Sequence, residues 1–456
     1  MTAPQLTIMQ GDALEKLREL PDESVHCVVT SPPYWGLRDY SKCSCVPQGR
    51  LEVAQDDRGD RHTPGGAIAF HRTGKAIEGC PICNGTGINQ EMLTQQLGLE
   101  KTPEEYVHKI VKIFREVRRV LRKDGGMWLN LGDTYAGGAG GYDPKYERPE
   151  LRDKHSGFIG ANGGNYREKR EWTNHPVLKP KDQCLIPHRV AIALQADGWW
   201  VRQTVIWSKN NPMPESCRDR CTSSHEYIFH LTKSAKYFYD QEAIREPFNY
   251  PDRKYNPNTT NHKTLGLREI GNRSTVGLHD GRTQYGDPKA GRNKRSVWTM
   301  STRPYPEAHF ATFPPELPET CIKAGTSLKG CCLECGAPWE RETEQEVIAR
   351  RKPEEGIRAN TPELGQDGAN SLRAGFRTLE IRTIGWQPTC SCGIEETIPC
   401  TVLDIFAGSG TTGEVARGLG RSCILIELNP EYIKLIKERT KYDIKAVDSF
   451  AFEGNA

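Results

Sequence analysis

The segment TVLDIFAGSGTTGEVARGLGRSCILIELNP, residues 401–430, decides the fold class of this chain. An apolar run ends at Asp404, and a loop of small residues then opens a predicted helix. A second apolar run ends at Glu427, where an acid can accept hydrogen bonds from both hydroxyls of a ribose. Strand, glycine loop, helix and strand in this order predict a nucleotide-binding α/β fold with a mostly parallel sheet.

The loop between strand and helix is AGSGTTG, residues 407–413. Glycine permits a tight turn and a close approach of a ligand to the backbone. Gly408, Gly410 and Gly413 also match the spacing GxGxxG, which alone is weak evidence for a dinucleotide cofactor. No lysine follows the glycines, so this is not a phosphate loop of the Lys-Ser/Thr kind. A purely structural turn and a nicotinamide site are the alternative interpretations.

Elsewhere the chain predicts further alternating strands and helices. One helix should begin at Pro103, with Thr102 as its N-cap, and end at the Asp-Gly-Gly of residues 124–126. The charge run of residues 341–353 is typical of a solvated face. The other predicted strands are residues 6–9, 25–30, 127–131, 199–207, 227–231, 401–406 and 423–427, and the other predicted helices are residues 13–20, 186–196, 411–419 and 430–441.

The tetrapeptide Ser31-Pro32-Pro33-Tyr34 follows the predicted strand 25–30. Two prolines cannot continue a central strand, so the chain leaves the sheet at the carboxyl edge, where parallel sheets bind ligands. Ser31 and a carbonyl of Pro32 or Pro33 can accept the two protons of an exocyclic amine, which frees its lone pair to attack a methyl sulfonium. Tyr34 would stack on a base that has left the duplex. The alternative is a rigid loop whose aromatic residues fill a core.

These two motifs together resemble the amino-methyltransferases of DNA, which act on N4 of cytosine or N6 of adenine. The catalytic tetrapeptide of that family is Ser, Asp or Asn, then Pro-Pro, then an aromatic residue, and its S-adenosylmethionine loop resembles DxFxGxGTT. The resemblance implies S-adenosyl-L-methionine as methyl donor and double-stranded DNA as substrate. The residues that match the cofactor loop are Asp404, Phe406, Gly408, Gly410, Thr411 and Thr412.

The resemblance extends to other parts of the cofactor site. Asp12, after Gly11, matches the contact to the adenine of the cofactor, and Glu427 and Asn429 match the ribose-binding stretch. Phe313, before a helix start, matches the position near the methionine end, and Ser327 joins it. Because the catalytic motif precedes the cofactor loop, the resemblance implies a circularly permuted Rossmann-like sheet with a DNA-reading region between the two halves.

The sequence pattern and this resemblance divide the chain into seven predicted segments. Residues 1–40 begin the catalytic half, 99–247 form the core with a loop insertion near 133–181, and 394–456 form the S-adenosylmethionine-binding half. The remaining segments are a cysteine-rich insertion at 41–98, a basic target-recognition region at 248–304, a cofactor-side helix at 305–330 and a second cysteine-rich insertion at 331–393.

The chain has 16 cysteines and no secretion signal, which favours reduced thiols and metal ligands over disulfides. Two sets of four have the paired spacing of zinc-ribbon-like sites, and four thiolates with no open position indicate structural Zn²⁺. Ordinary buried or free thiols are the alternative. Cys331 competes with Cys332, and His62 or His71 could replace a ligand of the first set. The two sets are Cys43, Cys45, Cys80 and Cys83, and Cys332, Cys335, Cys390 and Cys392.

The charge of the chain is close to balanced, with 62 Lys and Arg against 59 Asp and Glu. Residues 248–300, however, hold ten Lys and Arg and only four Asp and Glu, so we expect DNA contacts there, from Arg292, Lys294 and Arg295 among others. No apolar run approaches the ~20 residues of a membrane span, and the N-terminus lacks the signal-peptide pattern. We therefore expect a cytoplasmic protein of a prokaryotic or phage-infected cell, with a restriction endonuclease as a candidate partner.

The target atom is the finest prediction that the sequence allows. Serine before Pro-Pro leans toward N4 of cytosine in the family, while aspartate or asparagine leans toward N6 of adenine. We therefore predict N4 of cytosine, with N6 of adenine as the alternative. Methylation of RNA or of a protein amide, and a zinc-dependent DNA-binding protein with an inactive methyltransferase core, are the remaining alternatives.

Overall fold

The computed structural model describes residues 3–36, 48–49, 71–72, 95–136, 176–247, 292–303, 312–350 and 377–441. The chain divides into two compact units. Unit 1 comprises Met1–Tyr239, Arg295–Pro338 and Cys390–Ala456, and unit 2 comprises Asp240–Lys294 and Trp339–Thr389. Within the described residues, no helix combines the length and apolar character needed to cross a membrane.

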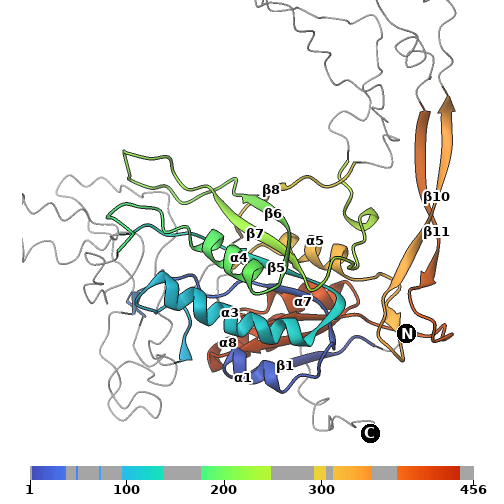
Figure 1. The fold of residues 1–456 in the computed structure, drawn as a ribbon, viewed down its shortest axis with the longest axis horizontal. Helices are drawn as coiled ribbons and strands as arrows, with labels where there is room; N and C mark the ends of the chain where they lie inside the picture. Colours follow the sequence, from blue (N-terminus) through green and yellow to red (C-terminus); the bar gives the residue numbers. More distant parts are fainter. Residues whose placement is uncertain are drawn as a thin grey trace, which may run out of the picture. The chain divides into compact units, whose positions relative to one another are not determined.

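An eight-stranded sheet forms the centre of unit 1 (Figure 1). All neighbouring pairs are parallel except those that involve β7, so the prediction of a mostly parallel sheet is confirmed. Two neighbouring strands inside the sheet, β13 and β2, come from opposite ends of the chain. In sheet order the strands are β1 (Leu6–Gln10), β14 (Ser422–Glu427), β13 (Thr401–Asp404), β2 (Val25–Thr30), β5 (Leu121–Leu131), β7 (His225–Thr232), β6 (Trp200–Ser208) and β8 (Val297–Thr299).

Helices pack against this sheet in two groups (Figure 1). In the first group α3 packs against both α1 and α4, and in the second α7 packs against both α5 and α8. Apolar side chains such as Leu17, Phe114 and Val190 are buried under the first group and form the main core. The helices are α1 (Ala13–Arg18), α3 (Pro103–Val120), α4 (Ile186–Ala196), α5 (Glu316–Gly325), α7 (Thr411–Gly418) and α8 (Pro430–Arg439).

Helix α3 shows where local signals succeed and fail. Thr102 caps its first turn as predicted, with its side chain accepting a hydrogen bond from the Glu105 N–H at 3.2 Å. The predicted end at residues 124–126 is wrong, because the helix stops at Val120 and β5 begins at Leu121. Leu121 is fully buried and pairs with Val25 of β2, so sheet pairing overrides the glycine stop signal.

Unit 2 contains an antiparallel ribbon of β10 (Trp339–Arg350) and β11 (Arg377–Pro388), and a short 3₁₀ helix η4 (Glu242–Ile244). Arg341 of β10 forms an ion pair with the buried Asp240 at 2.8 Å and lies over the ring of Trp386 at 4.5 Å. The charge run at 341–353 therefore falls largely on a ribbon strand.

Unit 1 contains two further pairs of short antiparallel strands. These are β9 (Cys331–Cys332) with β12 (Thr397–Ile398), and β3 (Gln48–Gly49) with β4 (His71–Arg72).

Candidate active site

Four neighbouring parallel strands of unit 1 end at one edge of the sheet. These strands, β1, β14, β13 and β2, finish at Gln10, Glu427, Asp404 and Thr30. Parallel strands point their carboxyl ends in the same direction, and ligands of α/β sheets bind at that edge. The predicted cofactor residues and the predicted catalytic loop are thus brought together from opposite ends of the sequence.

Asp404 connects β2, which precedes the predicted catalytic loop, to the glycine loop. One carboxyl oxygen accepts the Thr30 hydroxyl at 2.7 Å and the Phe406 N–H at 3.1 Å, and the other accepts the Thr412 hydroxyl at 2.6 Å. The side chain is buried, which raises its pKa to about 6 although these hydrogen bonds lower it. Asp404 and Thr412 therefore hold the loop in place from inside the fold, and Thr30 belongs to the same group although the sequence did not single it out.

The glycine loop is also fastened to the last helix, α8. Arg439 donates to the hydroxyls of Ser409 and Thr411, both at 2.8 Å. Gly410 has φ +81°, and a Cβ there would lie 3.2 Å from Ile436 of α8. Glycine at this position is needed for the left-handed turn and for the packing of the two helices, so Gly410 and Thr411 act through the shape of the loop.

Glu427 stands at the edge beside this loop. Its two carboxyl oxygens accept the N–H groups of Asn429 and Gly408, each at 2.8 Å. Burial raises its pKa to about 7, while these two N–H groups lower it. Each oxygen keeps a second lone pair, so the group retains the acceptors that a ribose diol needs. These acceptors fit the ribose of S-adenosylmethionine.

Asp12 and Asn429 lie next to Glu427 and begin helices. Asp12 accepts the N–H groups of Leu14 and Glu15 at 2.9 and 3.1 Å, which makes it the N-cap of α1. The adjacent Gly11 N–H donates to the Glu427 carbonyl at 3.0 Å. Asn429 caps α8 in the same manner, with its side chain accepting the Glu431 N–H at 2.9 Å. Both predicted cofactor residues are thus at the carboxyl edge and oriented by capping.

Helix α5 separates the two remaining predicted cofactor residues. Phe313 precedes its first turn, whereas its end at Gly325 packs on the Cys27 side chain. Ser327 follows the helix, and its carbonyl accepts the Cys400 thiol at 4.0 Å. Cys400 precedes the first residue of β13, at the opposite end of that strand from Asp404. The structure therefore does not bring Ser327 to the ligand edge, because a ten-residue helix spans ~15 Å and carries the chain toward the other end of β13.

The predicted catalytic loop, Ser31–Tyr34, is held by contacts with other parts of unit 1. The Tyr106 hydroxyl donates to the Pro33 carbonyl at 3.0 Å. A Cβ on Gly132 would lie 2.6 Å from the Tyr34 ring, so the residue after β5 packs closely against that ring. Of the two carbonyls that the sequence left open, that of Pro33 is engaged with Tyr106, which favours the Pro32 carbonyl as the second acceptor for an amine.

A polar cluster lies behind Ser31 and Tyr34, and the sequence did not predict it. The Tyr34 hydroxyl donates to Glu226 of β7 at 2.6 Å, and the buried Asn130 of β5 donates to the same carboxyl oxygen at 3.1 Å. Lys209 pairs with the other oxygen of Glu226 at 2.5 Å. Burial and then the Glu226 charge raise the Tyr34 pKa well above its usual value, so the phenol stays neutral. A polar residue inside an apolar strand, as in MWLNL (residues 127–131), was the available signal.

Known proteins share this sequence pattern. A family model described as DNA methylase, N6_N4_Mtase, matches residues 25–334 and 400–438. The chain belongs to the N6/N4 DNA methylase family.

Similar proteins cover nearly the whole methylase. It is 32% identical over 434 residues to the Type II methyltransferase M.XycI of Xanthomonas campestris pv. cyanopsidis, covering 95% of this chain and 87% of that protein. It is 31% identical over 433 residues to the Type II methyltransferase M.Cfr9I of Citrobacter freundii, with coverage of 95% and 87%. Among solved structures, the cytosine-N4-specific PvuII DNA methyltransferase has 14% identity and a TM-score of 0.43, covering 96% of this chain and 89% of that chain.

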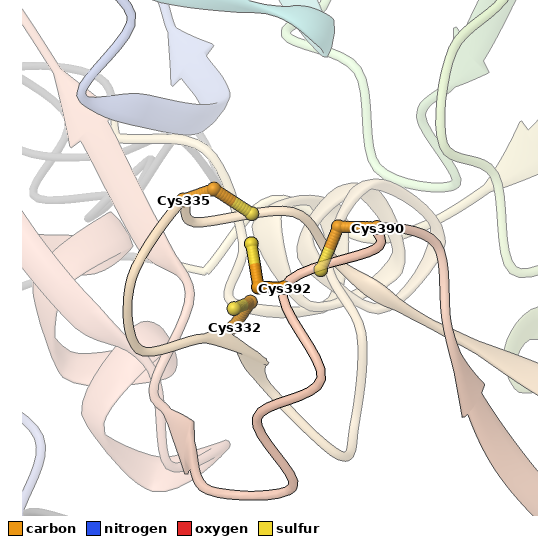
Figure 2. Close-up of side chains that lie close together, drawn as sticks. All are labelled: Cys332, Cys335, Cys390 and Cys392. Atoms are coloured by element: carbon orange, nitrogen blue, oxygen red, sulfur yellow. The ribbon is translucent and has the colours of Figure 1, made fainter.

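The family match omits residues 335–399, which carry most of the second cysteine set of the methylase. The structure brings this set together, with the four Sγ atoms within 4.8 Å of one another (Figure 2). The N–H groups of Cys335 and Glu334 are directed at Cys332 and lower the pKa of its thiol to about 7. Cys331 instead groups with His26 and Cys400, so Cys332 is the member of the set. The first set, Cys43, Cys45, Cys80 and Cys83, lies outside the described residues.

The predicted DNA-contacting residues occupy different surroundings. Arg292 and Lys294, in unit 2, both pair with Glu246, at 3.4 and 3.8 Å. Arg295, in unit 1, is exposed. Residues 248–291 of the basic region of the methylase lie outside the described residues.

Proposed function

We propose that this methylase transfers a methyl group from S-adenosyl-L-methionine to the exocyclic amine of a flipped base in double-stranded DNA, at N4 of cytosine. One observation carries the proposal. The catalytic loop Ser31–Tyr34 and the acidic Glu427 emerge from the same edge of one parallel sheet, and Asp404 joins their supporting segments by hydrogen bonds to Thr30 and Thr412.

Ser31 and Pro32 would supply the acceptors for the amine. The nitrogen lone pair of a base amine is delocalised into the ring, so the amine is a weak nucleophile. Hydrogen bonds from its two protons to the Ser31 hydroxyl and the Pro32 carbonyl draw the nitrogen toward tetrahedral geometry. The nitrogen then forms a bond to the methyl carbon, the carbon–sulfur bond breaks to leave a neutral thioether, and the nitrogen loses one proton to solvent.

The cofactor supplies an electrophilic methyl sulfonium when it is bound. Glu427 would accept the ribose hydroxyls, and Asp12 would lie at the adenine, since both stand at the carboxyl edge of adjacent strands. Phe313 would contact the methionine end from the start of α5. Asp404, Gly408, Gly410, Thr411 and Thr412 would maintain the loop that lies between these groups. We propose on the same ground that the order of catalytic and cofactor halves makes this a circularly permuted Rossmann-like fold.

The choice of cytosine rests on Ser31. A neutral hydroxyl can accept one amine proton without adding a fixed negative charge, and adenine N6 is the alternative target. Methylation-aware sequencing of DNA from cells that express the protein, or its Ser31→Ala variant, tests both the methyltransferase function and the choice of base. N4-methylcytosine at a defined sequence supports the proposal. N6-methyladenine would overturn the choice of base, and absence of any methylated amine would overturn the function.

The relatives M.XycI and M.Cfr9I are named Type II methyltransferases, and on this ground we propose a restriction endonuclease with the same recognition sequence as a functional partner.

The second cysteine set would bind a structural Zn²⁺, because four thiolates converge and each pair is followed by a glycine with positive φ. These ligands are Cys332, Cys335, Cys390 and Cys392, and the glycines are Gly336 and Gly393.

A further inference from the structure

We infer that Glu226 is a positioning residue for methyl transfer, and that it fixes the direction in which the Ser31 hydroxyl points its proton. The inference rests on the proposed function and adds a residue that neither the catalytic motif nor the cofactor loop contains. Glu226 lies on β7, with its side chain only 13% exposed, and Lys209 pairs with it at 2.5 Å.

The hydrogen-bond chain starts at the carboxylate. An ionised carboxylate only accepts hydrogen bonds, so the groups that face Glu226 must donate to it. The Tyr34 hydroxyl donates its single proton to Oε2 at 2.6 Å, and the Asn130 amide donates to the same oxygen at 3.1 Å. The Asn130 nitrogen also donates to the Tyr227 carbonyl at 3.3 Å, and these two donations turn the amide carbonyl of Asn130 toward the catalytic loop.

Ser31 completes the chain. The Asn130 carbonyl oxygen lies 3.4 Å from the Ser31 hydroxyl, and the Tyr34 oxygen lies 3.3 Å from it. The Tyr34 hydroxyl lies 2.6 Å from Glu226 and 3.1 Å from the Asn130 carbonyl oxygen, and its single proton goes to the closer, charged acceptor. Both of these oxygens therefore present acceptors to Ser31. The Ser31 proton is therefore directed inward, and its lone pairs are left for the substrate.

This direction matters for the reaction. A Ser31 hydroxyl that accepts an amine proton frees the nitrogen lone pair, whereas one that donates to the nitrogen would occupy that lone pair and prevent attack. Glu226 thus acts through Tyr34 and Asn130 to keep Ser31 an acceptor. The same arrangement disfavours a base that presents a carbonyl oxygen in place of the amine, because two acceptors would then face each other.

A double-mutant cycle between Glu226→Gln and Ser31→Ala tests the inference. Glutamine keeps the size of the side chain but adds an N–H group that can reverse the chain. We expect Glu226→Gln to lower the single-turnover rate at least about tenfold, with S-adenosylmethionine and DNA affinities unchanged. In the Ser31→Ala background the same change should have almost no effect, since the group through which it acts is gone. If the fold reductions in single-turnover rate of the two single variants multiply in the double variant, the inference is overturned.

The control and the second readout separate positioning from folding. The control is Asp197→Asn, which removes a carboxylate of similar exposure, 12%, from its ion pair with Arg115. This ion pair is not part of the hydrogen-bond chain between Glu226 and Ser31, so the variant should leave the single-turnover rate unchanged. Binding of a duplex with uracil in place of the target cytosine gives a readout without turnover, and Glu226→Gln should reduce the preference for cytosine. If Glu226→Gln does not fold, Tyr34→Phe interrupts the same chain and should show the same non-additivity with Ser31→Ala. Unchanged preference for cytosine, or additivity in both variants, would contradict the role of Glu226. Wild-type protein that methylates no DNA amine would instead refute the proposed function.

Discussion

The bond between Thr30 and Asp404 offers the sharpest test of how the site is held together. Thr30→Val keeps the shape of a fully buried side chain and removes only the hydroxyl that donates to Asp404 at 2.7 Å. Hydrogen bonds to charged groups contribute about 1.5–3 kcal/mol, against about 0.5–1.5 kcal/mol for neutral pairs. We expect Thr30→Val to lower the free energy of unfolding by about 2 kcal/mol at pH 8.

The pH dependence of this cost follows from the raised pKa of Asp404, about 6. The Thr30 hydroxyl stabilises the ionised carboxyl, so its loss raises the folded-state pKa further above the unfolded value of about 3.9. An acid with a raised folded-state pKa loses stability as pH rises between the two values. The charged part of the cost therefore develops as pH rises through about 6, and at pH 5 it should fall to about 1 kcal/mol.

Urea unfolding of the full-length protein at pH 5 and pH 8 measures these differences from the midpoints and slopes. Thr232→Val is the matched control, because Thr232 is also fully buried at a strand end and donates to a neutral carbonyl, that of Ser234, at 2.9 Å. Its cost should be about 1 kcal/mol at both pH values. Equal costs for the two variants, independent of pH, would show that Asp404 does not hold the catalytic strand through a charged hydrogen bond.

Three further predictions concern the cofactor, the metal and DNA. Glu427 has a pKa raised to about 7. If its ionised form accepts the ribose hydroxyls as proposed, S-adenosylmethionine affinity should rise between pH 6 and 8 in calorimetric titrations, and Glu427→Gln should remove that part of the rise. Protein purified without chelators should contain zinc by elemental analysis, about two ions per chain if both cysteine sets bind. Cys332→Ser should lose one ion, while the control Cys217→Ser should lose none, and equal content in both would refute the site. Neutralising the three basic residues should flatten the salt dependence of DNA affinity, and an unchanged slope would place the DNA contacts elsewhere; these residues are Arg292, Lys294 and Arg295.

Local patterns in the sequence were sufficient for most of the sheet and its helices. Helix α4 occurs at the predicted residues 186–196, and β2 at residues 25–30, because the pattern of buried apolar residues acts over a short stretch of sequence. The end of α3 could not be predicted in this way. Its chain enters β5 at Leu121 because β2 is available for pairing, and that neighbour is distant in the sequence.

The residues of the candidate site also differ in whether local sequence could predict them. Short motifs indicated Ser31, Glu427 and the glycine loop, because their chemistry is encoded in adjacent residues. Motif matching assigned Ser327 to the cofactor, but the length of α5 carries it to the other end of β13. Glu226 remained unnoticed because its connection to Ser31 depends on the pairing of β5 with β7, which no local pattern specifies.

Transfer of an isotopically labelled methyl group tests the central claim most directly. Purified protein would be incubated with labelled S-adenosylmethionine and duplex DNA, with RNA and protein in parallel reactions, and the products digested and identified by mass spectrometry. The account predicts label on the exocyclic amine of cytosine in DNA, and loss of that label in Ser31→Ala with cofactor binding retained. Label at a ring carbon, or in RNA or protein but not in DNA, would contradict it.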